Sequence, residues 1–183
     1  YKENGVKEEK DALLLIQALL NTPELPLVKK KKKKKENKNP PLLYNLAELQ
    51  NDCSKLFKIS PDETLRIVQE LYEKKLTTYP RTDARVLSTA VAKEIDKNIK
   101  GLTNYPILSE FAKEILNNKA YTGLKNTRYV NDKQITDHYA IIPTGQGIGT
   151  LSSLTPVASH VYELIARRFL AVFYPAAVYR KVL

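Results

Sequence analysis

One short polar stretch, Leu76–Arg85, holds the residue types that phosphoryl transfer requires. Tyr79 carries a hydroxyl that could attack phosphorus, and Arg81 stands two residues further on. A tyrosine hydroxyl, with a usual pKa near 10, is a poor nucleophile at neutral pH without help. A guanidinium can bind a phosphate through two parallel hydrogen bonds and stabilise charge that develops on its oxygens. The pair therefore indicates attack on a phosphate ester.

The backbone around these side chains is restricted. Pro80 fixes the chain immediately after Tyr79 and removes an amide donor, so a stiff loop is expected instead of a helix. Tyr79, Arg81 and Asp83 alternate, which predicts that they share one side of an extended segment. Asp83 could orient the arginine or accept hydrogen bonds in the turn. Taken alone, however, the triplet is weak evidence for catalysis. The chain has 11 tyrosines, and an exposed Arg–Asp pair ordinarily contributes under about 1 kcal/mol to stability.

Two predicted helices flank the loop. The run Ser60–Glu63 combines an N-cap serine, a proline at the first helical position and a glutamate that closes a capping box, so a helix should continue to about Lys75. Its apolar stripe includes Tyr72. Ser88 can cap a second helix, which Gly101 would end.

Helix signals are frequent elsewhere, and strand signals are few. Asn45, with Glu48 three residues on, resembles an N-cap and its capping partner. The other expected elements are an amphipathic helix over 7–20, a helix around 107–116, a long helix from Thr155-Pro156 to before Pro175, a small hairpin near 127–143, and an extended end over 176–183. The resulting fold class is mainly α with minor β.

The net charge of +10 suggests a polyanionic partner, but it is unevenly distributed. Residues 1–40 hold 11 lysines and 6 acidic residues, and the run Lys29–Lys35 accounts for most of that excess. Adjacent lysines repel one another, so this run is expected to be a mobile tether. Salt-dependent attraction to DNA phosphates is the other interpretation. The single cysteine, Cys53, favours a reducing, cytoplasmic setting, and no apolar run is long enough to span a bilayer.

Four motifs, in order, resemble those of type IA DNA topoisomerases. LYEKKLTTYPRTDARVLS is similar to the active-site signature of that family, where tyrosine lies in a Tyr-Pro-Arg-Thr-Asp-Ser context. Thr136–Thr144 resembles a second signature, Asp-His-x-Ala-Ile-x-Pro-Thr. Pro41–Gln50 and Arg167–Leu170 resemble the entry to and exit from the same domain. The Tyr-Pro form and the Thr-Asp-His context favour the topoisomerase III branch.

The resemblance implies a domain organisation. Residues 40–175 would form the active-site tyrosine domain, a helical domain with a winged-helix-like core similar to the catabolite activator protein. Residues 1–39 would be the end of an arch domain or a linker that contains the lysine run, and residues 176–183 a strand returning to the arch. The chain would then be a fragment of a longer polypeptide, which agrees with the absence of any methionine.

The resemblance also implies an ATP-independent enzyme that passes DNA strands through a transient single-strand break. Tyr79 would be the nucleophile that becomes joined to a 5′ phosphate. Arg81 would hold the scissile phosphate, and His138 would contact a DNA phosphate nearby. Thr82, Asp83 and Arg85 complete the expected DNA contacts.

Cofactor and partners follow from the same resemblance. The family binds Mg²⁺ through a Toprim domain with paired aspartates, and this sequence contains no Asp-x-Asp. Mg²⁺ is therefore expected to be bound outside this chain, which should be inactive alone. The expected partners are single-stranded segments of DNA and the remaining domains of the same polypeptide, in a cytoplasmic, nucleoid-associated monomer with no membrane contact.

Two positions depart from the family pattern, and three other functions compete. Ala84 stands where the family often has serine, and Tyr139 where topoisomerase III proteins often have a second histidine. A noncatalytic helix-turn-helix module could use Tyr79 and Arg81 only to touch DNA backbone. A tyrosine recombinase would need a His-x-x-Arg motif, which is absent. A purely structural interaction domain would leave both signatures unexplained. His160 matches no motif and is expected to be structural.

Overall fold

The structure is a computed structural model that describes residues 8–21 and 33–182. These residues separate into two compact units, one over 37–177 and one formed by the two ends of the chain, up to 36 and from 178. The larger unit is helical, with a core of buried aliphatic and aromatic side chains. The smaller unit contains one helix and most of a two-stranded sheet. The expected class, mainly α with minor β, is confirmed; the assignment of the ends to an arch domain stays a prediction.

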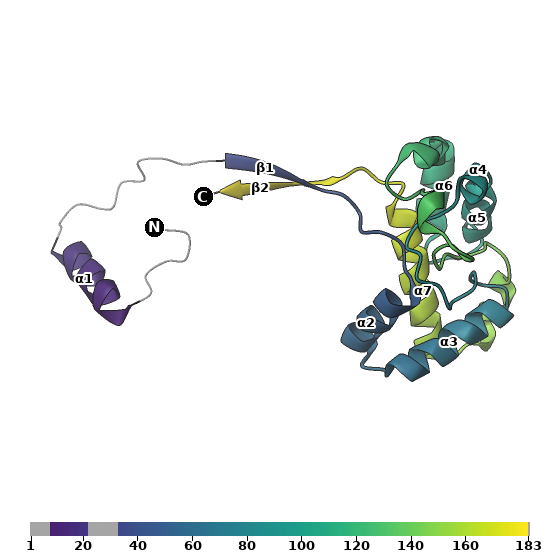
Figure 1. The fold of residues 1–183 in the computed structure, drawn as a ribbon, viewed down its shortest axis with the longest axis horizontal. Coiled ribbons are helices and arrows are strands. Elements are labelled where there is room, and N and C mark those ends of the chain that lie inside the picture. Colours follow the sequence, from purple (N-terminus) through teal and green to yellow (C-terminus); the bar gives the residue numbers. More distant parts are fainter. Residues whose placement is uncertain (1–7, 22–32, 183) are drawn as a thin grey trace. The chain divides into compact units, whose positions relative to one another are not determined.

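The larger unit is built around its last helix (Figure 1). That helix, α7, packs against α2 and α3, while α5 packs against α6. Its inward face buries Tyr162, Ile165 and Phe169 completely, so this helix contributes large side chains to the core. The elements are α2 (Leu46–Phe57), α3 (Pro61–Glu73), α4 (Thr89–Lys93), α5 (Ile95–Leu102), α6 (Ser109–Asn117), the 3₁₀ turns η1 (Ala120–Asn126), η2 (Asp132–Gln134) and η3 (Ile148–Ser153), and α7 (Pro156–Ala171).

Side-chain caps begin the helices that the sequence indicated. The backbone N–H of Glu63 donates to Ser60 Oγ at 3.1 Å, and Pro61 follows at the first helical position. The same bond, from an N–H three residues along, is accepted by Asn45 (2.9 Å), Ser88 (3.2 Å) and Thr155 (3.2 Å). Each cap satisfies an amide that has no partner within its helix.

The helix expected from Ser88 to Gly101 is wrong in detail. It is divided into α4 and α5 at Glu94, whose φ of −112° and ψ of 11° are not helical. Gly101 does not end α5 but lies within its last turn. A glycine is needed there because another segment passes very close. A Cβ on Gly101 would lie 2.0 Å from the carbonyl oxygen of Gly145, so only glycine fits.

The hairpin expected near 127–143 does not form. This segment instead makes single β-bridges with distant residues, antiparallel between Tyr44 and Ile141 and between Thr77 and Pro143. Another stretch of it pairs in parallel fashion at Val130. The local pattern indicated extended chain correctly, but the partner strands lie far away in the sequence, where no turn signal identifies them.

In the smaller unit, α1 (Glu9–Leu20) is the amphipathic helix that the sequence predicted, and its leucines are exposed. The strands β1 (Lys33–Lys38) and β2 (Ala177–Val182) pair with each other. The tether expected for Lys29–Lys35 is thus wrong for Lys33–Lys35, which belong to β1; the first four lysines lie outside the described residues. None of the helices in the described part of the chain is long and apolar enough to cross a membrane.

Candidate functional site

The loop after α3 is held against the second signature by backbone pairing. The N–H of Thr78 donates to the carbonyl of Ile142 at 3.0 Å, and the N–H of Thr144 donates to Leu76 at 3.0 Å. The Thr78 hydroxyl donates to the carbonyl of Ala140 and accepts from the N–H of Ile142, both at 3.0 Å. Tyr79 thus follows a residue whose backbone and side chain are both tied to the segment that begins at His138.

Thr82 makes the second tie. Its hydroxyl donates to the carbonyl of His138 at 3.1 Å and accepts from the N–H of Ala84 at 3.1 Å. Its own carbonyl accepts from Leu46 at the start of α2, at 3.1 Å. Thr82 is 7% exposed, and its hydroxyl both donates and accepts a hydrogen bond within the protein. Thr82 therefore positions the loop. The DNA contact expected of it stays a prediction, and this burial favours a structural role.

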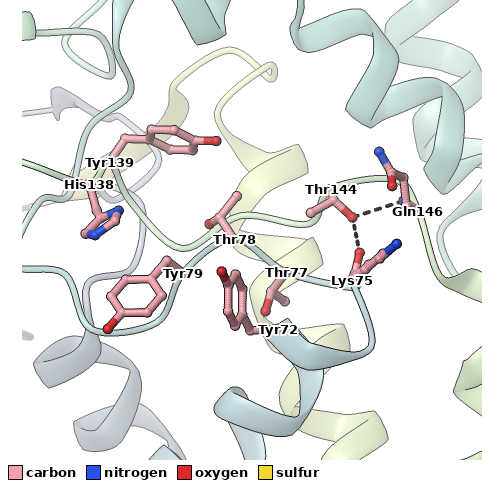
Figure 2. A pocket seen from close by; sticks show the side chains of 9 residues that line it. All are labelled: Tyr72, Lys75, Thr77, Thr78, Tyr79, His138, Tyr139, Thr144 and Gln146. Atoms are coloured by element: carbon pink, nitrogen blue, oxygen red, sulfur yellow. Dashed lines mark hydrogen bonds between the residues drawn. The ribbon is translucent and has the colours of Figure 1, made fainter.

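The two signature side chains meet at this point. The rings of Tyr79 and His138 lie 4.4 Å apart between centroids with a 38° tilt. The centroids of the Tyr72 and Tyr79 rings lie 5.4 Å apart, and these two rings meet edge to face. Figure 2 shows the Tyr79 ring between the other two, with its hydroxyl pointing away from both. Tyr79 is half-buried, and its hydroxyl makes no hydrogen bond with the described residues. The ring is thus fixed by stacking while its oxygen stays available.

A cavity of about 380 Å³ adjoins this ring stack (Figure 2). Its wall is polar and aromatic and contains no carboxylate. The lining residues are Tyr72, Lys75, Thr77, Thr78, Tyr79, His138, Tyr139, Thr144 and Gln146. Burial raises the pKa of the Tyr139 hydroxyl above its ordinary value.

The expected alternation along the loop is present, but the expected ion pair is not. Pro80, Thr82 and Ala84 are buried, whereas Arg81 and Asp83 are exposed. Arg81 forms no ion pair or hydrogen bond with any residue that the structure describes, so the hypothesis that Asp83 orients it is wrong. Asp83 contributes its backbone carbonyl instead, which accepts from the Asn45 side chain at 3.1 Å.

Arg85 and Ala84 face the protein. The Nε of Arg85 donates to the Leu43 carbonyl at 3.3 Å, and its guanidinium lies 3.5 Å from a Glu48 oxygen. These partners favour a role in joining the loop to α2, and the DNA contact expected of Arg85 stays a prediction. Ala84 is 9% exposed, so the missing serine hydroxyl would have lain at the edge of the core.

Several lining residues escaped the sequence reasoning. Tyr72 was expected in the apolar stripe of α3, but it is 40% exposed and lines the cavity. Lys75 adopts a left-handed φ of 62° after α3, and no sequence signal marked it or Thr77 as site residues. Thr144, by contrast, ends the second signature and could have been included. His160 stacks on Phe57 at 5.8 Å between ring centroids and is exposed; it does not line this cavity.

Comparisons with known proteins identify the family of this chain. A family model described as DNA topoisomerase matches residues 1–182. The DNA topoisomerase 3 of Bacillus subtilis is 43% identical over 143 residues, which make up 77% of this chain and 19% of that protein. The DNA topoisomerase 3 of Bacillus cereus strain ATCC 14579 is 39% identical over 145 residues, 78% of this chain and 19% of that protein. The chain thus spans about a fifth of the length of these relatives.

A solved structure supports the fold. Full-length topoisomerase I from Thermotoga maritima aligns with 100% of this chain and 28% of its own, with a TM-score of 0.62 and 21% sequence identity.

Proposed function

Because this chain belongs to the DNA topoisomerase family, we propose that it is the strand-cutting part of an ATP-independent type IA topoisomerase of the topoisomerase III kind. The observation that carries the proposal is the state of Tyr79. Its ring is fixed between His138 and Tyr72, while its hydroxyl has no hydrogen-bond partner among the described residues. A nucleophile needs this combination of a held side chain and an available oxygen.

The proposed reaction exchanges one phosphate ester for another. The Tyr79 oxygen attacks phosphorus and loses its proton; the bond from phosphorus to the 3′ oxygen breaks, and that oxygen leaves and takes up a proton. The product is a 5′-phosphotyrosyl ester and a free 3′ hydroxyl. The ester keeps the bond energy, so the reverse reaction reseals the strand without ATP.

Arg81 and His138 are the proposed phosphate ligands. Arg81 is exposed, two residues beyond the nucleophile, and its guanidinium is not engaged by any carboxylate in the described chain. It can therefore bind the scissile phosphate and stabilise charge on its oxygens. His138 is exposed and packs against the Tyr79 ring, so its imidazole can reach a phosphate close to the attacked one.

The residues present do not fit a magnesium site. Mg²⁺ prefers carboxylate oxygens, and the cavity beside Tyr79 has none. No group of three His, Cys, Asp or Glu side chains suited to a metal ion occurs within residues 8–21 and 33–182. We propose that the expected Mg²⁺ binds another part of the polypeptide, and the roles proposed for Tyr79, Arg81 and His138 do not depend on it. Single-stranded DNA as substrate, the monomeric state and the cytoplasmic location stay predictions.

The test uses the full-length protein with single-stranded DNA and Mg²⁺, stopped with detergent. We expect a covalent product in which peptide mapping finds the 5′ phosphate on Tyr79, and no such product from the 183-residue chain alone. Attachment to any other residue would overturn the assignment. DNA binding without any covalent product would support a noncatalytic binding module instead.

A further inference from the structure

We propose that the cavity beside Tyr79 binds one unpaired nucleobase of the strand being cut, namely the base next to the attacked phosphate. The inference rests on the proposed function and adds a base-reading subsite to it. Tyr79 is itself part of the cavity wall, so a base inside the cavity belongs to a nucleotide that adjoins the phosphate at the Tyr79 hydroxyl.

The walls of the cavity suit a flat aromatic ligand. Tyr72, Tyr79 and Tyr139 line it together with His138, and Figure 2 shows the Tyr139 ring opposite the Tyr72 side. Unpaired bases stack on such side chains in proteins that bind single strands, because every base has a π face. The volume of about 380 Å³ also lies within the range of small-ligand sites.

A buried polar atom without a partner supports a ligand at this position. Thr77 is 1% exposed, and its hydroxyl has no hydrogen-bond partner within the described chain. It is one of two such side-chain atoms among the described residues, the other being the hydroxyl of Tyr162 in the core. Burying a hydroxyl without a partner is costly. Figure 2 shows the Thr77 oxygen on the Tyr72 side of the cavity. The atom is closed to solvent, so the edge of a base bonds with it only after the Thr77 side chain rotates towards the cavity.

The far end of the cavity offers further groups for a base edge. The Thr144 hydroxyl is occupied, since it donates to the Lys75 carbonyl and accepts from the N–H of Gln146. These bonds hold the backbone, while the Lys75 ammonium and the Gln146 amide make no hydrogen bond or ion pair with the described residues. Ring nitrogens and carbonyl oxygens of a base are suitable acceptors for both.

The first experiment locates the base. The full-length protein carrying Tyr79→Phe, which keeps the ring but cannot form the ester, is titrated with single strands in which one abasic site is moved along the sequence. We expect affinity to fall about 10-fold at one position next to the mapped cleavage site, from the combined loss of stacking and of the hydrogen bond to Thr77. Equal losses at all positions, or none, would overturn the inference.

The second experiment uses the two unpartnered hydroxyls as a matched pair. Thr77→Val and Tyr162→Phe each remove one of them and should each raise Tm. Only Thr77→Val should shrink the penalty of the abasic site, by about 5-fold, because its hydroxyl bonds the base. A Thr77→Val protein with a higher Tm and an unchanged abasic penalty would show that this hydroxyl serves no base.

The two levels of proposal can fail separately. If wild-type protein attaches DNA through Tyr79 but shows no position-dependent abasic penalty, the base subsite is wrong and the proposed function stands. If Tyr79→Phe still forms a covalent product, the proposed nucleophile is wrong, whatever the cavity binds.

Discussion

Two tyrosines lie on either side of the same extended segment, and their surroundings differ in almost every respect. Tyr44 bridges to Ile141, and the residue before Tyr79 bonds to Ile142. The Tyr44 side chain is 1% exposed, and Arg168 lies over its ring, 4.1 Å from the centroid. Tyr79 is half-buried, and within the described residues its side chain makes ring contacts but no hydrogen bond.

The hydroxyl groups differ more than the rings. Tyr44 donates to Asp52 at 2.7 Å and accepts from Arg168 at 2.9 Å, and Arg168 also donates to Asp52 at 2.7 Å. Burial, followed by the hydrogen bond to Asp52, raises the pKa of Tyr44 well above its ordinary value. Its proton and lone pair are both in use, so Tyr44 joins α2 to α7 and is no nucleophile. The same side chain thus has an occupied or an available hydroxyl according to whether its oxygen has partners.

The largest expected effect separates these two tyrosines directly. Tyr79→Phe in the full-length protein should reduce covalent DNA attachment by about 10⁴-fold or more, because the attacking atom is gone. Unfolding free energy should change by less than about 0.5 kcal/mol, since no hydrogen bond is lost. Tyr44→Phe is the matched control and should show the reverse, with attachment retained and stability lowered by about 1 kcal/mol. Cleavage assays and urea unfolding measure both; equal loss of attachment in the two variants would contradict the comparison.

Arg81→Gln comes next and tests whether an unpaired guanidinium serves the reaction. We expect attachment to slow by about 10²–10³-fold, the usual effect of removing one transition-state donor. Stability should stay unchanged, because no described carboxylate pairs with Arg81. Single-turnover cleavage rates beside urea melts give the answer, and Arg66→Gln, on the exposed side of α3, is the control. If Arg81→Gln lowered the unfolding free energy by as much as it raised the activation free energy of cleavage, Arg81 would have a structural role.

Arg168→Met tests the opposite region. It removes the ion pair with Asp52, the bond to Tyr44 and a 3.2 Å bond to the Leu42 carbonyl. Breaking a largely buried pair should cost about 3 kcal/mol of unfolding free energy. Arg167→Met, whose ion pair with Glu163 is exposed, should cost under about 1 kcal/mol. Urea denaturation compares the two, and similar losses would mean that the Tyr44 network adds little to stability.

The last prediction concerns the pH dependence at Cys53, which follows Asp52 in the same region. Cys53 is fully buried, and burial raises the pKa of its thiol to about 11. The folded protein therefore keeps a proton that the unfolded chain loses above about pH 9, so stability should fall as pH rises from 9 towards 11. Tyr44 and Tyr162, whose pKa burial raises, should add to this fall. A thiol reagent at pH 8 should label Cys53 only in denaturant. Fast labelling of folded protein would show that this region opens.

Local signals accounted for much of the fold. Asn45, Ser60, Ser88 and Thr155 each cap a helix through an N–H three residues away, so a few neighbouring residues determine where these helices begin. The same reasoning failed at Gly101, which was taken as a helix end. The close approach of Gly145 decides that position, and nothing near Gly101 in the sequence reveals it.

The candidate site shows the same division. Residue types and spacing, with the family resemblance, singled out Tyr79, Arg81 and His138, and the alternation around Pro80 predicted which side chains face outward. They did not indicate that His138 would stack on Tyr79, or that Asp83 would leave Arg81 unpaired.

The sequence by itself determined where the capped helices begin, the stiff loop over Leu76–Arg85 and the identity of the groups that could do chemistry, because caps, prolines and motifs act within a few residues. Only the tertiary structure decided which tyrosine hydroxyl is occupied and which is available, and that Thr77 lies unpartnered beside a cavity. Those outcomes depend on pairing between the Tyr79 loop and the segment after His138, and on the packing of α7 against α2. Contacts between segments so far apart in the sequence produce no local pattern of residues, so the sequence alone could not predict them.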